Sequence, residues 1–220
     1  MLQFAVTFLA KAHLTMSSIS QLEFNLTALR SGDRAEFARL VDAYSGQIYR
    51  LALKMLQDSQ DAEDILQETF IKAYRALPDF EGRSSISTWL YRIATNEALM
   101  FLRRKQPEQT SVDEDEQSEP RYRHPQQIVD WCCLPEDELM STEARNNLDL
   151  SVQKLSDGLR AVFLLREFEG LSTRETAEVL DISEAAVKTR LSRARLQLRE
   201  HLSSYYKERL PDAAKEADDV

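Results

Sequence analysis

Apolar residues recur at helical spacing in three segments of the first half of the chain. The first covers about 33–55 and opens with Asp33, a residue whose carboxylate can cap a helix N-terminus. The second covers about 61–77 and ends before Pro78, which cannot continue a helix. The third covers about 86–105 and follows two serines, which are further capping residues. The pattern therefore predicts three long helices that bury their apolar stripes together.

Helical spacing returns in the second half of the chain, after a stretch with four prolines and little apolar periodicity. Two apolar segments, 148–155 and 159–168, are followed by Gly170, which we expect to end the second of them as a C-cap. Two further helices are predicted at 172–180 and 184–205, with a three-residue turn between them.

The scarcity of turn residues supports an all-α fold. Only five glycines and six prolines occur in 220 residues, whereas sandwiches, barrels and doubly wound sheets need many tight turns. We therefore predict two small helical domains joined by an acidic flexible linker, the second domain containing a helix-turn-helix. The predicted limits are an N-terminal extension at 1–26, a first domain at 27–105, a linker at 106–147, a second domain at 148–206 and an acidic tail at 207–220.

Charge is distributed unevenly along the chain, whose net charge is −9. Taken as a whole, this charge argues against a polyanionic partner. However, the linker alone holds eleven acidic and three basic residues, and 211–220 holds four acidic residues and one basic residue. The rest of the chain is slightly positive, so nucleic acid is not excluded as a partner of the two domains.

The strongest local motif is the last pair of predicted helices. Ser172 can cap the first of them and Ser183 the second. The small Ala177 allows a close approach between the helices, and Val187 can anchor the second one in the core. A short capped helix, a tight turn and an apolar anchor are typical of a helix-turn-helix.

The second helix of this motif is apolar on one side and basic on the other. Five basic residues and no acidic one occur from Ala185 to Arg199. A positive helix face suits the DNA major groove, and the alternative is a solvated face of an amphipathic helix. The preceding capped helix and turn favour DNA binding. The candidate DNA-contacting residues are Lys188, Thr189, Arg190, Ser192, Arg193 and Arg195.

The helix predicted at 61–77 has an unusual outer face. Asp64, Glu68 and Ile71 fall opposite the apolar stripe, and an exposed Ile among carboxylates exceeds what solubility requires. Such a face suits a basic partner helix, and a solvated helix face is the alternative. The apolar stripe of this helix is predicted to contain Ala62, Leu66, Phe70, Ala73 and Leu77.

The helix predicted at 86–105 and the loop before it carry residues suited to unpaired DNA. Aromatic rings stack on bases, the Asn96 amide suits base edges, and the basic residues at the end of the helix suit phosphates. The alternative places Trp89 in the core and assigns the terminal basic residues to the helix dipole.

Two sets of motifs together resemble one known family. The segments 61–74, 80–82 and 87–96 resemble domain 2 of the extracytoplasmic-function sigma factors of bacterial RNA polymerase, and the helix-turn-helix resembles their domain 4. The resemblance covers about 30–105 and 148–203, in the family's order and spacing. It implies a factor that binds core polymerase and directs promoter-specific initiation at −35 and −10 elements, without catalysis in this chain.

The resemblance also implies roles for individual residues. Docking on the clamp helices of the largest polymerase subunit is implied for the segment that contains Asp64, Gln67, Glu68 and Phe70, with Phe70 expected in the core. The helix face described above adds Asp61 and Ile71 to the predicted docking residues. Binding of the −10 element is implied for Phe80, Arg83, Ser84, Arg92, Asn96, Arg103 and Arg104. The six candidates of the helix-turn-helix would contact the −35 element. The β-subunit flap, promoter DNA and an anti-sigma factor are expected partners, and the acidic linker would thread the polymerase channels as an RNA-like polyanion.

One position departs from the family pattern. Met100 stands where many relatives carry an acidic or amide side chain, so no −10 contact is expected from that turn.

Neither a cofactor nor a metal is expected. The only cysteines, Cys132 and Cys133, are adjacent in the linker, and with His124 they offer only three candidate metal ligands. A redox-sensitive thiol pair is an alternative, and a patch that packs on a partner is the interpretation we prefer. Cysteine usage and the lack of a basic leader predict a cytoplasmic protein without membrane contact. The apolar run Leu2–Ala10 is too short to span a bilayer, and translation from Met16 would omit it.

Three other function classes compete with this interpretation. A stand-alone helix-turn-helix regulator leaves the face around Ile71 unexplained. A hydrolase would need a second convergent set of catalytic side chains beside Glu63, Asp64 and Glu68, and the sequence contains neither this nor a glycine-rich phosphate loop. An adaptor would share the fold without supporting initiation, so transcription with core polymerase separates all four classes.

Overall fold

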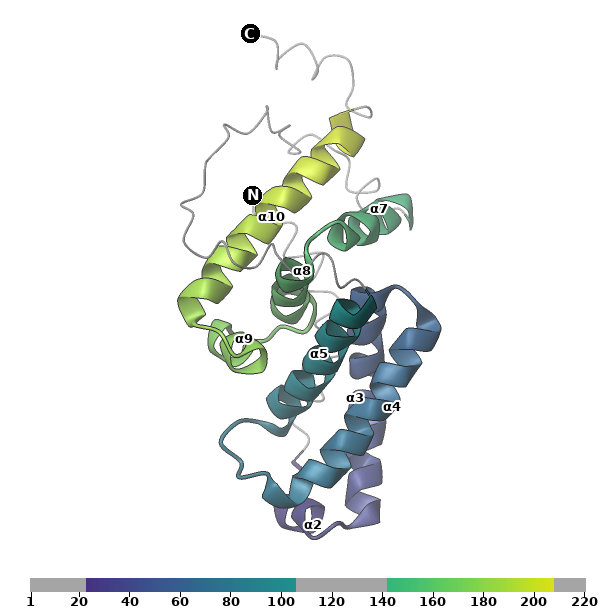
Figure 1. The fold of residues 1–220 in the computed structure, drawn as a ribbon, viewed down its shortest axis with the longest axis vertical. Coiled ribbons are helices and arrows are strands. Elements are labelled where there is room, and N and C mark those ends of the chain that lie inside the picture. Colours follow the sequence, from purple (N-terminus) through teal and green to yellow (C-terminus); the bar gives the residue numbers. More distant parts are fainter. Residues whose placement is uncertain (1–22, 106–141, 208–220) are drawn as a thin grey trace.

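The computed structural model of the chain describes residues 23–105 and 142–207, and every regular element in these two ranges is helical. The all-α prediction is therefore confirmed for this part of the chain. Figure 1 shows two groups of helices, with α2 to α5 in one and α7 to α10 in the other. Most of the predicted linker, with its cysteines, lies outside the described residues.

Three long helices and two short elements form the first group. The long helices α3, α4 and α5 pack pairwise against one another, and each contributes buried residues to the core. The short α2 lies against η2, a single 3₁₀ turn that contains Pro78. The bounds are α2 Leu26–Arg30, α3 Arg34–Leu56, α4 Ser59–Ala76, η2 Leu77–Asp79 and α5 Ile86–Lys105.

Side-chain caps set where these helices begin. The Asp33 carboxylate accepts a hydrogen bond from the backbone N–H of Glu36 at 2.9 Å, which confirms the predicted start of α3. The Ser85 hydroxyl accepts from the backbone N–H of Thr88 and starts α5 as predicted. By contrast, α4 begins at Ser59, two residues earlier than predicted, because Asp58 caps its first turn.

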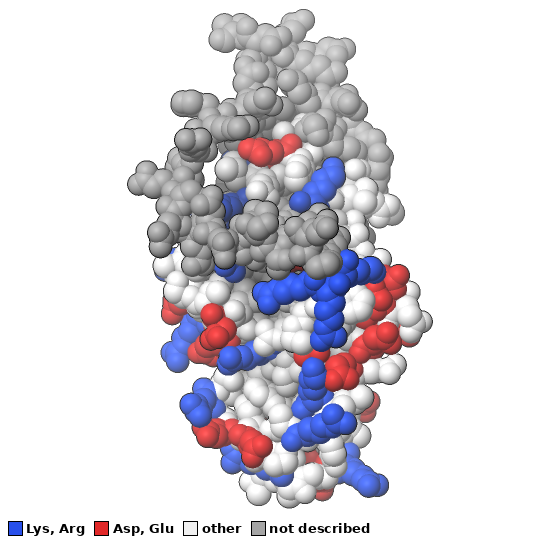
Figure 2. Space-filling model, viewed as in Figure 1, with Lys and Arg blue, Asp and Glu red and all other residues white. Residues whose placement is uncertain are grey.

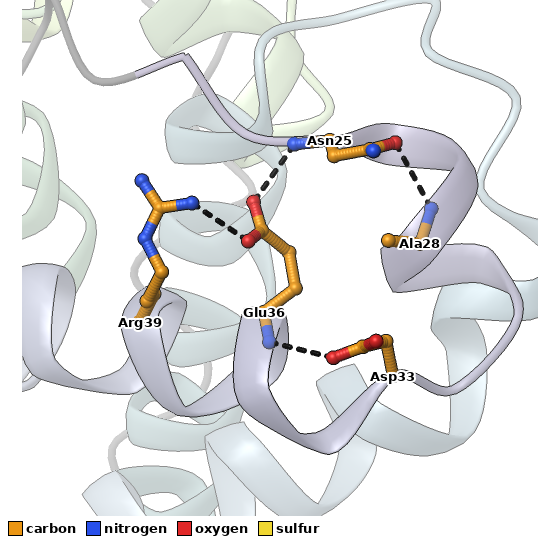
Figure 3. Close-up of polar contacts among 5 residues, drawn as sticks. All are labelled: Asn25, Ala28, Asp33, Glu36 and Arg39. Atoms are coloured by element: carbon orange, nitrogen blue, oxygen red, sulfur yellow. Dashed lines mark hydrogen bonds and ion pairs between the residues drawn. The ribbon is translucent and has the colours of Figure 1, made fainter.

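The first domain begins earlier than the predicted residue 27. The ring of Phe24 lies 6.0 Å from the ring of Tyr44, and Asn25 caps α2. Figure 3 shows how Glu36 joins the two helices: its carboxylate accepts from the backbone N–H of Asn25 at 2.8 Å and from Arg39 at 2.7 Å. The hydrogen bond from Asn25 is the main reason that the pKa of the Glu36 carboxyl lies below its usual value, and the hydrogen bond from Arg39 adds to the effect. Phe24 and Asn25, which the sequence assigned to the extension, therefore contact the first group of helices.

The buried face of α4 is wider than the predicted stripe. Ala62, Phe70 and Ala73 are buried as predicted, but Leu66 is only partly buried. Ile65 and Thr69 take its place in the core, and the Thr69 hydroxyl donates to the Ile65 carbonyl at 2.6 Å. The reason is that α4 packs against α3 and α5 at once, which buries a broader arc of the helix.

The second group contains four helices and a π-helical turn. Helix α10 packs against α7, α8 and α9, and it supplies the longest apolar stripe of this core. The segment predicted to end at Gly170 does so, with Gly170 at φ 65°, but its last turn widens into the π-helical η5. The bounds are α7 Thr142–Gln153, α8 Asp157–Phe163, η5 Leu164–Phe168, α9 Thr173–Leu180 and α10 Glu184–Lys207.

The two groups pack directly on each other. Helix α9 packs against α5, while α7 and α8 contact the end of α3 (Figure 1). Within the described ranges, no helix has the combination of length and apolar character that crossing a membrane requires.

The cap of α3 generates a stability prediction. Replacing Asp33 with Ala removes the acceptor for the Glu36 N–H and is expected to lower the free energy of unfolding by about 1 kcal/mol. Thermal unfolding followed by circular dichroism measures the effect. Asp42→Ala, an exposed position inside the same helix, is the matched control and should leave stability unchanged or slightly higher. Equal melting of Asp33→Ala and the wild type would contradict the assigned cap.

Candidate protein and nucleic-acid interfaces

The outer face of α4 carries four of the five predicted docking residues. Asp64 and Gln67 are exposed, Glu68 is partly exposed, and Ile71 exposes 44 % of its surface. The fifth, Asp61, is turned towards the end of α5, where its carboxylate pairs with the Lys105 ammonium at 3.0 Å. The face therefore presents an apolar side chain beside carboxylates, as the sequence predicted.

A lysine links this face to α5. The Lys72 ammonium lies 2.6 Å from the Glu97 carboxylate and 3.5 Å from that of Glu68. The hydrogen bond from Lys72 to Glu97 raises the pKa of Lys72 above its usual value, so this cation stays charged at neutral pH. Glu68 is thus held on the outer face by a charged neighbour, while its carboxylate remains accessible.

A groove beside this face was missed by the sequence analysis. Its volume is about 530 Å³, and Tyr74 of α4 forms one side with 42 % of its surface exposed. The Phe37 ring of α3 lies 4.9 Å from the Tyr74 ring. Phe37 and Val41 fit the buried stripe of α3 by spacing, but both remain partly exposed here. The groove is lined by Arg34, Phe37, Ala38, Val41, Asp42 and Tyr74.

The loop before α5 forms a second hollow of about 360 Å³. Four predicted −10 residues line it together: Phe80, Arg83, Ser84 and Arg92. Arg83 donates to Glu81, and this hydrogen bond holds the pKa of the Glu81 carboxyl below its usual value. Two carboxylates, Asp79 and Glu81, also line the hollow, so the two arginines, and not a net positive charge, are the groups that suit a phosphate.

Phe80, which is predicted to contact DNA, lines this hollow with little of its surface exposed. Its ring lies 4.9 Å from that of Trp89. Trp89 itself is partly exposed and lines the hollow. The aromatic surface offered by this hollow is therefore Trp89, with Phe80 supporting it from behind.

The remaining −10 candidates extend along α5. Asn96 is exposed one turn beyond Arg92, and Arg103 and Arg104 are exposed in the last turn. At 1.5 Å per residue, Arg103 lies roughly 16 Å from Arg92 along the helix, so the set forms a track rather than one pocket. In Figure 2 basic residues gather over the C-terminal end of α5, and acidic residues gather beside them over α4.

The helix-turn-helix has the predicted local structure. Ser172 and Glu175 form a complete capping box at the start of α9, and the Ser183 hydroxyl accepts from the Ala186 N–H at the start of α10. Ala177 and Val187 are buried where the two helices meet. Both cap predictions and both core predictions are confirmed.

The candidate DNA residues of α10 differ in accessibility. Lys188, Thr189 and Ser192 are exposed, whereas Arg190 and Arg193 are partly exposed. Arg195 was predicted to contact DNA, but its guanidinium is paired with the Glu167 carboxylate of η5 at 2.5 Å. It thus ties α10 to η5 in this arrangement. No group of three His, Cys, Asp or Glu suitable for a metal occurs among the described residues.

Comparison with known families covers both groups of helices. The sequence model of Sigma-70 region 2 matches residues 40–108, and that of Sigma-70, region 4 matches residues 145–198. The first range contains the docking face and the hollow before α5, and the second contains the helix-turn-helix. Together the two matches cover more than half of the chain.

Individual relatives and solved structures agree with these matches. The ECF RNA polymerase sigma factor SigW of Bacillus subtilis is 39 % identical over 79 % of this chain and 92 % of its own length. The RNA polymerase sigma-H factor of Pseudomonas aeruginosa is 36 % identical over 76 % and 86 %. The structure of CnrH in complex with the cytosolic domain of CnrY matches with a TM-score of 0.58 and 26 % identity, over 81 % of this chain and 95 % of that one. This chain therefore belongs to the extracytoplasmic-function (ECF) sigma factors, within the sigma-70 family of bacterial RNA polymerase.

Proposed function

We propose that the two groups of helices in this alternative sigma factor have different binding roles. The protein binds core RNA polymerase and directs promoter-specific initiation, as members of its family do. In our proposal, α2 to α5 dock on core polymerase and hold the −10 element, while α9 and α10 read the −35 element. The observation that carries the proposal is that two separate family matches fall, in order, on the two helical groups.

The proposed polymerase contact is the outer face of α4 extended by the adjacent groove. Ile71 supplies an apolar anchor, and Asp64 and Glu68 supply negative charge that suits a basic partner helix. Tyr74 and Phe37 continue the apolar surface onto α3. We assign this surface to the clamp helices of the largest polymerase subunit.

The proposed −10 site is the hollow before α5 together with the exposed track along that helix. Trp89 offers a ring on which an unpaired base stacks, and Arg83 and Arg92 flank it with positive charge. Asn96, one turn further, offers donors and an acceptor to a base edge. Arg103 and Arg104 would contact phosphates downstream in the track.

The proposed −35 site is the exposed face of α10. Lys188, Thr189, Ser192 and Arg193 provide a positive and polar surface that fits the DNA major groove. We leave Arg195 out of this set because its guanidinium pairs with the largely buried Glu167, whereas the Arg83–Glu81 pair of the −10 hollow is exposed and therefore weak.

We also propose an anti-sigma partner and a cytoplasmic site of action, where core polymerase is found. The structural relative CnrH was solved in complex with the cytosolic domain of another protein, CnrY. A stand-alone DNA-binding regulator remains the competing function. It accounts for α9 and α10 but gives no role to the exposed Ile71 or to the groove beside it.

The docking surface generates a prediction about core binding. Glu68→Lys reverses a charge on the face, and Ile71→Glu buries a carboxylate against the partner. Each change is expected to weaken binding to core polymerase about tenfold or more, which corresponds to about 1.4 kcal/mol. Fluorescence anisotropy of the labelled full-length protein titrated with core polymerase measures the affinity.

A matched control separates a local contact from a general charge effect. Glu23→Lys makes the same charge reversal at an exposed residue away from α4 and should leave the affinity for core polymerase unchanged. Binding of −35 DNA should be the same in all three variants. Unchanged affinity of both Glu68→Lys and Ile71→Glu for core polymerase would remove α4 from the interface.

The exposed face of α10 generates a prediction about DNA binding. Arg193→Ala is expected to cost about 1 to 3 kcal/mol at the preferred −35 element if Arg193 contacts a base. A contact to phosphate would instead weaken binding to all sequences equally. Electrophoretic mobility shifts on specific and scrambled duplexes measure the difference, with Arg199→Ala, further along α10, as the control. Binding by Arg193→Ala that equals the wild type on both duplexes would contradict the assignment.

A further inference from the structure

Helix α2 lies close to the loop that forms the −10 hollow. Figure 1 shows α2 at the end of the first group where the chain passes from α4 to α5. It packs against η2, the turn that precedes this loop. Leu29 exposes only 1 % of its surface and anchors α2 in the core, while Asn25 caps its first turn. The position of α2 beside the hollow is therefore fixed by the fold, although the sequence analysis gave this helix no role in DNA binding.

Two side chains of α2 face this loop. A β-carbon at Gly82 would lie 3.8 Å from the Arg30 guanidinium and 3.9 Å from a methyl group of Leu26. Gly82 has no such atom and adopts a φ of 75°, so the loop passes close to both side chains. Leu26 and Arg30 are four residues apart, which places them on the same face of α2.

Arg30 adds a positive charge beside a hollow whose own charges cancel. Two carboxylates, those of Asp79 and Glu81, and two arginine side chains line the hollow. The pKa of the Glu81 carboxyl lies below its usual value, mainly because of the hydrogen bond from Arg83, and the charge of Arg30 adds to the effect. The Arg30 guanidinium therefore acts on the same loop from α2. With Arg30 included, the charge around the loop is positive, which favours a nucleic-acid backbone.

Leu26 offers apolar surface beside this charge. It exposes 38 % of its surface, whereas Leu29 of the same helix is buried. A single exposed leucine has no meaning by itself. Here, however, it lies next to a guanidinium and next to a loop that lines the hollow. Unpaired nucleotides are bound by this combination, a cation for the phosphate and an apolar surface for the base.

We propose that Leu26 and Arg30 form a second nucleotide-binding position beside the −10 hollow. Arg30 contacts the phosphate of the nucleotide next to the one held in the hollow, and Leu26 packs against the base of that neighbouring nucleotide. The proposal rests on the assignment of the hollow to the −10 element. In Figure 1, α5 runs from the loop away from α2. The DNA strand therefore follows α5 on one side of the hollow and reaches α2 on the other.

Binding of single-stranded DNA by the holoenzyme tests the phosphate contact. The probes are fluorescent oligonucleotides of the non-template strand that span the −10 element of a promoter mapped by run-off transcription. Each probe carries one uncharged methylphosphonate in place of a phosphate, and fluorescence anisotropy measures its affinity. For the wild type, neutralising one linkage next to the nucleotide in the hollow should weaken binding about fivefold.

Arg30→Ala removes the cation and should bind the unmodified probe about fivefold more weakly than the wild type does. Neutralising that same linkage should then cause no further loss, because the group that contacts the phosphate is absent. The other linkages should keep their effects. Leu26→Ser should also weaken binding, but it should remain sensitive to the linkage that Arg30 contacts.

Lys154→Ala is the matched control. It removes one positive charge from an exposed lysine that follows α7 and does not line the hollow. This variant should bind every probe as the wild type does. Circular dichroism should show equal helicity in all variants, and their affinity for core polymerase should be equal.

Two results would refute the second nucleotide position while leaving the −10 assignment intact. The first is an Arg30→Ala holoenzyme that binds every probe as tightly as the wild type does. The second is a weakened Arg30→Ala holoenzyme that responds to the same linkages as the wild type, because Arg30 would then act only through the loop. By contrast, failure of the wild-type holoenzyme to bind any probe would overturn the −10 assignment, and the second position with it.

Discussion

Each helix that carries function in this protein must bury one face in its own group and leave another face for a partner. Helix α10 buries Val187, Leu191 and Ala194, and this burial fixes which side chains reach outward. Helix α4 does the same between α3 and α5, so Ile71 remains outside although it is apolar. Because each helix is packed on its inner face, the positions of the side chains on its outer face are set before any partner binds.

Helix α5 also forms part of the interface between the two groups of helices. Its residues near the hollow serve the −10 site, while Tyr91 on the same turns is buried against Glu169. One helix thus takes part both in the proposed reading of DNA and in the contact with the helix-turn-helix group. Arg92, which we propose contacts DNA, has the carboxylate of Asp181 beside it at 4.0 Å.

Charge separation within the chain explains how an acidic protein can bind DNA. The net charge is −9, but α10 carries a run of basic residues and α5 ends in Arg103, Arg104 and Lys105. Fields of this kind act over about a Debye length, roughly 8 to 10 Å in physiological salt. A basic helix face is therefore effective towards DNA even though acidic residues dominate elsewhere.

Signals within a few residues predicted where the helices lie. Contacts between residues far apart in the sequence could not be predicted. Caps such as Ser172 and Ser183 act within three residues, so the sequence alone located the starts of α9 and α10. The contact of Tyr91 with Glu169 joins residues 78 positions apart, and no local pattern announces it.

The pairing of Arg195 with Glu167 and the groove near Tyr74 were missed for a related reason. Periodicity assigns a side chain to a helix face, but the neighbouring element decides whether that face is covered. Glu167 of η5 reaches Arg195 from another helix, and α4 leaves Phe37 only partly covered. The outer face of α4 was predictable because it needed only the period of one helix.

Run-off transcription with bacterial core polymerase, with and without this protein, tests the central claim most directly. Templates from the genomic promoter regions of the source organism provide the candidate sites. The account predicts transcripts that depend on the protein, whose start sites share −35 and −10 elements at a fixed spacing. Binding to core polymerase without any such transcript on these templates would contradict it.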